Sequence, residues 1–259
     1  MIVGELERRL DEAIPFIWAE GWDNVGLLLG DRSALVRGTA VALDPSIDAM
    51  KAALDHSCSV LITHHPLIFH PLKRIDCAEG PGAQIAFAIR HGLTVFSLHT
   101  NWDVAPGGVN AAIAEVLSLQ EVRPLLPSTT GAWGSGAAGK FPRPLNFLEC
   151  GAAIRDALHL SRLELHGDMK TSVSTLALCG GSGGTFLPEA FACGAEAYFT
   201  ADMKYHERLD ALDKGVSLFI ADHGEMERFS LTALAETVSK ATGEKAKILD
   251  VSQPAFCMI

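Results

Sequence analysis

Short apolar segments of strand character alternate with amphipathic helical segments along most of this chain of 259 residues. The strand-like segments are residues 36–44, 60–63 and 93–100. The helical segments are residues 5–19, 45–57, 82–92 and 107–119. Strands that alternate with helices pack as sheets covered by helices. The alternation therefore predicts a mixed α/β fold and argues against an all-β fold.

The second part of the chain repeats the strand order of the first. Residues 92–100 (GLTVFSLHT) align with 215–223 (GVSLFIADH), and residues 58–63 (CSVLIT) align with 194–200 (GAEAYFT). Upstream of these segments, VALDPS corresponds to LALCGGS. Repeats of this kind indicate duplicated units, although convergence of α/β units would produce the same order. We therefore expect two similar α/β halves, each with a mixed sheet flanked by helices.

A segment rich in Gly, Ser, Ala and Pro separates the two halves, at residues 126–146. Such a composition is typical of an exposed loop. We therefore place the boundary near Pro127, with the first half at 1–127 and the second at 128–259.

The formal net charge of −10 disfavours binding to nucleic acids and to anionic membranes, because no basic run reverses the local field. No apolar stretch approaches the about 18 residues of a membrane helix, and the N-terminus has no apolar signal segment. The six cysteines form no C-x-x-C pair, as is usual for free thiols in a reducing compartment. We therefore expect a cytoplasmic protein that binds neither nucleic acid nor membrane.

The segment LITHHPLIF ends an apolar strand with two adjacent histidines, His64 and His65, followed by Pro66. Adjacent side chains of a regular strand point to opposite faces, but the pleat breaks at the end of a strand, and proline prevents a simple continuation. Both imidazoles can then lie in one crevice, because ligands of open α/β sheets bind beyond the carboxyl ends of the strands. Taken alone, the pair is equally compatible with one surface histidine and one capped core histidine.

Three further strands end in residues of the same chemical kind. These residues are His99 and Asp103, Asp202 and His206, and His223 and Glu227. The last two pairs have i, i+4 spacing, which places side chains on one face of a helix. Solvated loop residues are the alternative, but they would have to occur at four strand ends along one sheet edge. We therefore predict a metal site.

The donor types restrict the metal. Imidazoles with carboxylates and no thiolate suit Zn²⁺, Mn²⁺, Fe²⁺, Co²⁺ or Ni²⁺. As few as five of these candidates would exceed what one tetrahedral ion needs, and carboxylates can bridge two ions about 3.5–4 Å apart. We therefore predict two divalent metal ions per chain.

Six motifs resemble the Nif-three-like dinuclear-metal family, also known as the GTP cyclohydrolase I type 2 family. They are GWDNVGLLLGD, LITHHPLIF, SLHTNWDVAPGGVN, LALCGGSGG, YFTADMKYHE and ADHGEMER, in the family's order and across most of the chain. The resemblance implies that the metal ligands are His64, His65, Asp103, His223 and Glu227. It also implies a ring-shaped homohexamer of intertwined α/β halves, with the metal site between the halves.

The chain departs from the family's pattern beside these ligands. Thr200-Ala201-Asp202 stands where the family often has Thr-Gly-Glu or Thr-Gly-Asp, and Asp222 stands where it often has glycine. These changes bear on the choice of substrate more than on metal binding. The chain is also too short for the domain that longer relatives carry in mid-chain, so we expect only a loop at residues 128–145.

The resemblance implies a metal-dependent hydrolase that opens the guanine ring of GTP. Water activated by the metals would attack C8, and ring opening would release formate and lead to dihydroneopterin triphosphate. His206, Asp202 and Glu225 are the candidates for proton transfer. One alternative is a two-metal phosphoesterase that acts on a nucleotide-like substrate and releases inorganic phosphate. The other is a metal-binding scaffold for protein partners, without turnover.

Other residues admit two interpretations. The turn CGGSGG at 179–184 could bind phosphate through its backbone amides, but it lacks a P-loop lysine and is equally compatible with a tight strand-to-helix turn. His99 could support the metal ligands, although such histidines are more often structural. Trp22 and Trp102 could stack on a base, although we expect them to anchor the core or a loop.

Overall fold

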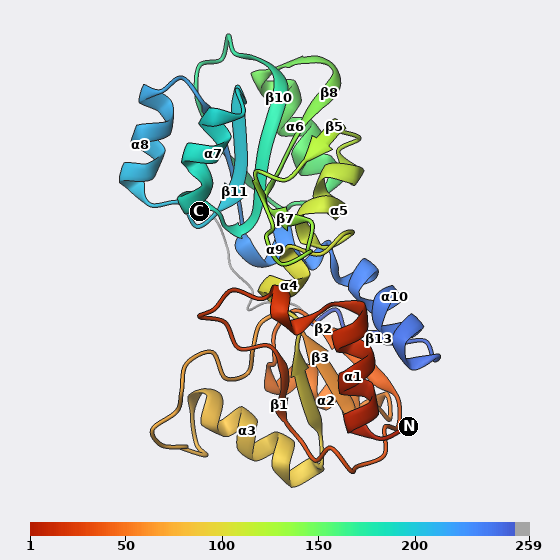
Figure 1. The fold of residues 1–259 in the computed structure, drawn as a ribbon. Coiled ribbons are helices and arrows are strands. Elements are labelled where there is room, and N and C mark those ends of the chain that lie inside the picture. Colours follow the sequence, from red (N-terminus) through yellow and green to blue (C-terminus); the bar gives the residue numbers. More distant parts are fainter. Residues whose placement is uncertain (252–259) are drawn as a thin grey trace. The chain divides into compact units, whose positions relative to one another are not determined.

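The computed structural model describes residues 1–251 and divides the chain into two compact units (Figure 1). The first unit comprises residues 1–102 together with the segment that begins at Leu231, and the second comprises residues 103–230. This division differs from the continuous halves 1–127 and 128–259 that we expected. Residues 103–127 belong to the second unit, and the chain returns to the first unit after residue 230.

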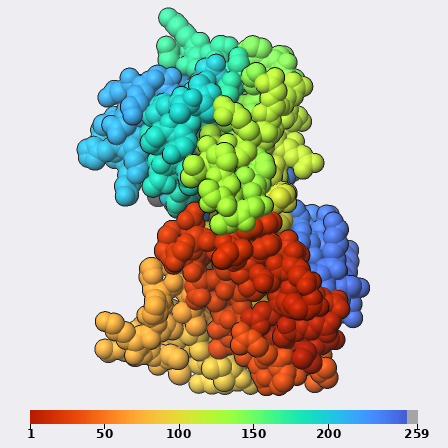
Figure 2. All heavy atoms as spheres, viewed as in Figure 1, coloured from red at the N-terminus to blue at the C-terminus, as the bar shows by residue number. Residues whose placement is uncertain are grey.

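The returning segment packs against the start of the chain. Helix α10 (Leu231–Thr242) contacts α1 (Val3–Ala13), and Figure 2 shows the blue C-terminal segment beside the red N-terminal part. The first unit is therefore discontinuous in sequence, as the expected intertwining of the two halves requires. The sequence predicted a first helix over 5–19, but α1 ends at Ala13, because Pro15 disfavours helical backbone in the residue before it.

A five-stranded sheet forms the centre of the first unit, in the order β1-β4-β3-β2-β13. Its strands are β1 (Gly26–Leu29), β2 (Thr39–Ala42), β3 (Val60–Thr63), β4 (Thr94–Ser97) and β13 (Lys247–Ile248). Four of them run parallel, and β1 is antiparallel to β4. Strands β2, β3 and β4 are buried along their whole length, as expected for a sheet with both faces covered.

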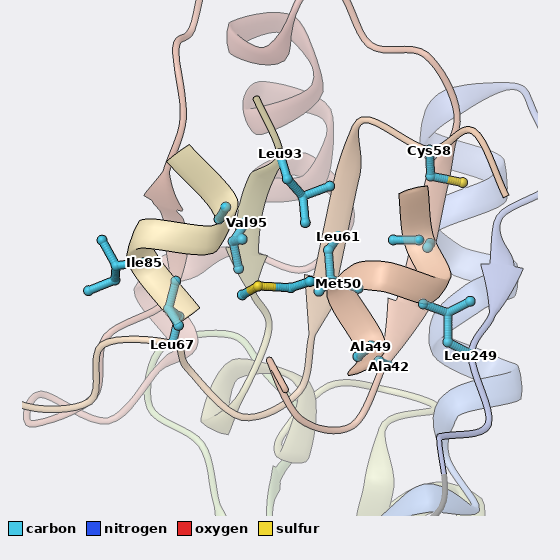
Figure 3. Packing of buried hydrophobic residues seen from close by; sticks show 13 residues of the cluster. Ala42, Ala49, Met50, Cys58, Leu61, Leu67, Ile85, Leu93, Val95 and Leu249 are labelled. Carbon is cyan, nitrogen blue, oxygen red and sulfur yellow. The ribbon is translucent and has the colours of Figure 1, made fainter. Parts of the chain in front are cut away.

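Helices α2 (Ile47–Asp55) and α3 (Gly80–His91) cover one face of this sheet. Met50 of α2 packs with Leu61 and Val95 of the sheet in one apolar cluster (Figure 3). Side chains that alternate with these along β3 and β4, such as Phe96, are also buried, and α1 and α10 pack against β1 and β2.

A six-stranded sheet forms the centre of the second unit, in the order β5-β8-β10-β11-β12-β9. Its strands are β5 (Gln120–Arg123), β8 (Ala137–Asn146), β9 (Leu163–His166), β10 (Ser172–Ser182), β11 (Ala197–Ala201) and β12 (Ser217–Ala221). Strands β10, β11 and β12 are parallel, while β8 and β9 flank them antiparallel. The second unit also contains a separate two-stranded antiparallel ribbon of β6 (Leu126–Pro127) and β7 (Gly134–Ser135).

Helices cover both faces of the second sheet. Leu218 of β12 packs in a cluster with residues of α7 (Leu187–Ala192) and α8 (Tyr205–Asp213). Its neighbour Phe219 points to the other face and stacks on Phe147 of α6 (Phe147–Ala157), with ring centroids 5.3 Å apart. Helix α5 (Val109–Val116) contacts β8 and β10, and α9 (His223–Arg228) follows β12 directly.

The segment expected to be only a loop, residues 128–145, contains most of the ten-residue strand β8. It pairs with β10 on one side and with β5 on the other. Gly139 permits the close pairing, because a Cβ there would lie 2.9 Å from the Cβ of Leu119. A composition typical of loops was misleading here because small residues also allow close packing of neighbouring strands.

The two sheets share one arrangement of strands. Each has three parallel strands in chain order, β2-β3-β4 in the first unit and β10-β11-β12 in the second, and an antiparallel strand beside the third. The mixed α/β class predicted from the sequence is thus confirmed. Among residues 1–251, no helix combines the length and apolar character that crossing a membrane requires.

Candidate metal centre

In the first unit, the two adjacent histidines lie directly beyond the end of β3. Two hydrogen bonds hold the backbone of His64. Its amide donates to the carbonyl of Ala42, and its carbonyl accepts from the hydroxyl of Ser97 at 2.9 Å. The rings of His64 and His65 approach to 5.1 Å between centroids, so the strand end brings both imidazoles together, as predicted.

A third imidazole, His99, joins them from the end of β4. Its ring centroid lies 5.1 Å from that of His64 and 5.7 Å from that of His65. One ring nitrogen from each of the three histidines lies within 4.8 Å of the others, a spacing that could hold a metal ion. This geometry supports His99 as a metal donor, a role that its sequence context alone did not favour.

Each of the three imidazoles is oriented by an oxygen acceptor at Nδ1. The acceptors are the carbonyl of Leu98 for His64 (3.1 Å), Asp44 Oδ1 for His65 (2.8 Å) and Asp23 Oδ1 for His99 (2.9 Å). Because carbonyl and carboxylate oxygens only accept, Nδ1 must carry the proton in each ring, and Nε2 carries the lone pair. Metal-binding histidines are usually held in this way.

Asp23 is the most constrained of these acceptors. Its side chain is fully buried, and it accepts hydrogen bonds from the amide and hydroxyl of Thr100 as well as from His99. Burial alone would raise the pKa of Asp23, but these hydrogen bonds outweigh it and lower the pKa to about 2. Asp23 is therefore a carboxylate throughout the physiological range, and it fixes both His99 and the start of the following helix, α4 (Thr100–Asp103).

In the second unit, His223 is the first residue of α9, which begins after β12 with Asp222 as its N-cap. Its Nε2 lies 3.0 Å from Oε2 of Glu227, one turn further along the helix, as the i, i+4 spacing predicts. Its Nδ1 lies 2.6 Å from Oδ2 of Asp202. Burial opposes protonation, but the hydrogen bonds and charges of Glu227 and Asp202 outweigh it and raise the pKa of His223 to about 9.

Two predicted carboxylate ligands, Asp103 and Glu227, lie near enough to Cys179 of β10 for their charges to act on its thiol. Burial, together with the charges of Asp103 and Glu227, raises the pKa of this thiol well above its usual range. Asp103 is fixed through its carbonyl, which accepts from the side-chain amide of Asn110 at 3.0 Å. Gly181 lies so close to Glu227 that a Cβ there would be 2.3 Å from Oε1. Close packing against Glu227 is therefore a sufficient reason for glycine at position 181 of the CGGSGG turn, and phosphate binding is not needed to explain it.

The three residues predicted for proton transfer lie in different surroundings. Asp202 holds His223 and accepts from the hydroxyl of Ser182 at 3.0 Å. Glu225 accepts from the amide of Ser161 at 2.9 Å. His206 is exposed on α8 beside Tyr205. Asp202 and His206 share no helical face, because Asp202 precedes α8 and has a φ of 47°.

Sequence reasoning missed Asp23 and Asp44 as partners of the histidines. Asp44 had a signal, since it follows β2 as the other candidates follow their strands. For Asp23, the only sequence signal was its position in the GWDNVG motif. Of the two tryptophans considered as stacking residues, Trp102 is buried in the core, as expected, while Trp22 is exposed.

Comparisons with known proteins agree with this fold. A family model described as Duf34/NIF3 (NGG1p interacting factor 3) matches residues 1–254. A Clostridium perfringens protein named GTP cyclohydrolase 1 type 2 homolog is 28% identical over 242 residues, which are 93% of this chain and 92% of that protein. A Campylobacter jejuni protein of the same name is 30% identical over 240 residues, 91% of each chain.

The fold is also similar to a solved structure. The crystal structure of Staphylococcus aureus protein SA1388 matches with a TM-score of 0.91 and 25% sequence identity, covering 100% of this chain and 99% of that chain. The family match extends over almost the whole chain, and the relatives are matched over nearly their full length. This chain therefore belongs to the Duf34/NIF3 family.

Proposed function

We propose that this protein is a dinuclear metal-dependent hydrolase. Its two divalent ions would be held by His64, His65, Asp103, His223 and Glu227, with His99 as a further donor. The observation that carries the proposal is the orientation of the three imidazoles of the first unit. Each donates a hydrogen bond from Nδ1–H to an oxygen, so that Nε2 is the atom available to a metal, and one ring nitrogen from each lies within 4.8 Å of the others.

Two of the proposed ligands, Asp103 and Glu227, lie close in sequence to the points where the chain leaves one unit for the other. Asp103 is the first residue of the second unit, four residues after His99. Glu227 lies three residues before Ser230, where the second unit ends. Both carboxylates are thus within a few residues of a point where the chain passes from one unit to the other.

The residues present fit hard or borderline divalent cations. Imidazole nitrogens and carboxylate oxygens suit Zn²⁺, Mn²⁺, Fe²⁺, Co²⁺ and Ni²⁺. When bound, two such cations would lower the pKa of water and offset negative charge that develops on a substrate. The chain's own part is to hold the donors in place through Asp23, Asp44 and Asp202. Glu225 and His206 remain the candidates for proton transfer.

We propose GTP as the substrate, with formate and dihydroneopterin triphosphate as products. The support is the name of the relatives, GTP cyclohydrolase 1 type 2 homolog, together with the six motifs shared with that family. We further propose that the protein is cytoplasmic and assembles as a homohexamer, as the family resemblance implies. The negative net charge of −10 supports a small-molecule substrate over nucleic acid.

The test combines metal analysis with a product assay. The protein is purified without chelators, its metals are measured, and GTP is then supplied while formate and inorganic phosphate are both assayed. About two metal ions per chain with release of formate is the expected result. Phosphate without formate would favour the two-metal phosphoesterase, metal without either product would favour the scaffold, and absence of transition metal would overturn the proposal.

A further inference from the structure

Two aromatic side chains of the first unit are exposed side by side. Trp22 is 60% exposed and Phe69 is 40% exposed, and their ring centroids lie 5.7 Å apart in an edge-to-face arrangement. Aromatic side chains of this size are normally buried, at least on average. An exposed pair of them in contact is therefore an informative feature of the surface.

The pair lies against the histidine cluster. The ring of His99 is 6.4 Å from the ring of Trp22 and 6.1 Å from the ring of Phe69, between centroids. The chain links both rings to the cluster, since Trp22 directly precedes Asp23 and Phe69 follows His65 by four residues. The aromatic surface thus adjoins the imidazoles whose nitrogens form the candidate metal donors.

Hydrogen bonds hold the loops that carry the two rings. The side-chain amide of Asn24 donates to the carbonyl of Ile68 at 2.5 Å, which joins the loop of Trp22 to the segment of Phe69. Asp23, between Trp22 and Asn24, is anchored to His99 and Thr100. The loops that carry the aromatic pair are therefore held in place before any ligand arrives, which reduces the entropy lost on binding.

We infer that Trp22 and Phe69 form the surface that receives the planar ring of the substrate, next to the metal donors. This inference rests on the proposed function and deepens it, because it names a binding surface for the heteroaromatic base. Nucleobases of any sequence stack on exposed aromatic side chains, since every base has a π-face. A ring held there lies beside His99, and so beside the candidate metal donors.

The experiment compares a ligand that has a ring with one that lacks it. Dissociation constants of GTP and of inorganic tripolyphosphate are measured calorimetrically on the full chain loaded with its native metal. The variants are Trp22→Ala, Trp22→Phe and, as control, Ile17→Ala, which removes a more exposed apolar side chain (75%) from the same unit. Metal content, thermal melting and light scattering are recorded for each.

Trp22→Ala should weaken GTP binding about tenfold, which corresponds to about 1.4 kcal/mol, and leave tripolyphosphate binding unchanged. Trp22→Phe should keep most of the affinity, and Ile17→Ala should match the wild type. Equal effects on both ligands, or none on either, would overturn the inference. So would dissociation of the assembly in Trp22→Ala, because the rings would then be covered by a second copy of the chain.

The two proposals can fail separately. Formate released by the wild type, with GTP binding unaffected in Trp22→Ala, overturns the binding surface alone. GTP binding that depends on Trp22, without any formate, overturns the proposed reaction alone. A wild type that neither binds GTP nor releases formate overturns both.

Discussion

Asp23 and His99 are 76 positions apart in the chain, yet Asp23 Oδ1 lies 2.9 Å from Nδ1 of His99. The same relationship recurs between Asp44 and His65 and between Asp202 and His223. A carboxylate at Nδ1 sets the orientation of the ring and increases the basicity of the opposite nitrogen. These carboxylates should therefore affect metal binding from a position behind the donors.

Asp202→Asn tests this role in the second unit. Asparagine is isosteric and tolerates the positive φ of 47°, so the backbone should be kept, while the charge at His223 Nδ1 is lost. We expect metal affinity to fall about 10- to 100-fold. Competition with a chromophoric chelator measures the affinity, with the exposed Asp210→Asn on α8 as control. Wild-type affinity in Asp202→Asn would show that the carboxylate does not support His223.

Glu227→Gln and Glu225→Gln form a matched pair on one short helix. Glu227 faces His223 at 3.0 Å, whereas the Glu225 carboxylate accepts from Ser161. A neutral amide neither bridges two cations well nor offsets their charge, so Glu227→Gln should lose metal. Glu225→Gln should keep both ions, and a loss of turnover there would indicate a role in proton transfer or substrate binding. Metal content and formate release are measured together, and full metal in Glu227→Gln would contradict the ligand assignment.

Asp23→Asn should destabilise the first unit in a pH-dependent way. The folded pKa of about 2 lies below the ordinary value of 3.8, so ionised Asp23 favours the folded state. The contribution, about 2 kcal/mol, is complete above about pH 5 and is lost as the pH falls toward 2. Urea unfolding at pH 7 should thus separate the variant from the wild type, and the difference should shrink near pH 3.

The control for this measurement is Asp31→Asn. Asp31 is fully exposed, and its hydrogen bonds to Ser33 lie in solvent, so the substitution should change stability little. If the two substitutions shift the urea midpoint equally, burial of Asp23 is not the source of the effect.

The assembly is tested by light scattering. We expect a mass several times 27.6 kDa, and nearest to six chains. Exposed large apolar side chains such as Leu126 and Leu148 on the second unit are available for contacts between copies. A monomer at micromolar concentration would contradict the proposed hexamer.

Much of the candidate site could be predicted because its residues follow recognisable local rules. His64 and His65 follow an apolar strand, and His223 and Glu227 obey helical spacing. The same spacing rule failed for Asp202 and His206, because it applies only where both residues belong to one helix. At φ 47° the backbone turns at Asp202, and the carboxylate contacts His223 instead.

The pairing of carboxylates with histidines could not be predicted, because it depends on strand register. Ala42 of β2 pairs with Thr63 of β3, which brings Asp44 level with His65 two residues further on. Ala201 likewise pairs with Ala221, which places Asp202 close to His223. A single sequence contains no direct record of register between parallel strands, because nothing local fixes it. The unit boundaries were missed for a similar reason, since the return of α10 to the first unit is a long-range contact.

The discontinuity of the first unit has a consequence for biosynthesis. A ribosome makes β2, β3 and β4 early, but β13, which pairs with β2, and α10, which packs on α1, emerge only after residue 230. Until then the edge of β2 has unpaired backbone groups, which invite association with other chains. The inserted second unit is continuous in sequence, so it can finish folding before the first unit is complete. The N-terminal third of the nascent chain should therefore need protection by chaperones most.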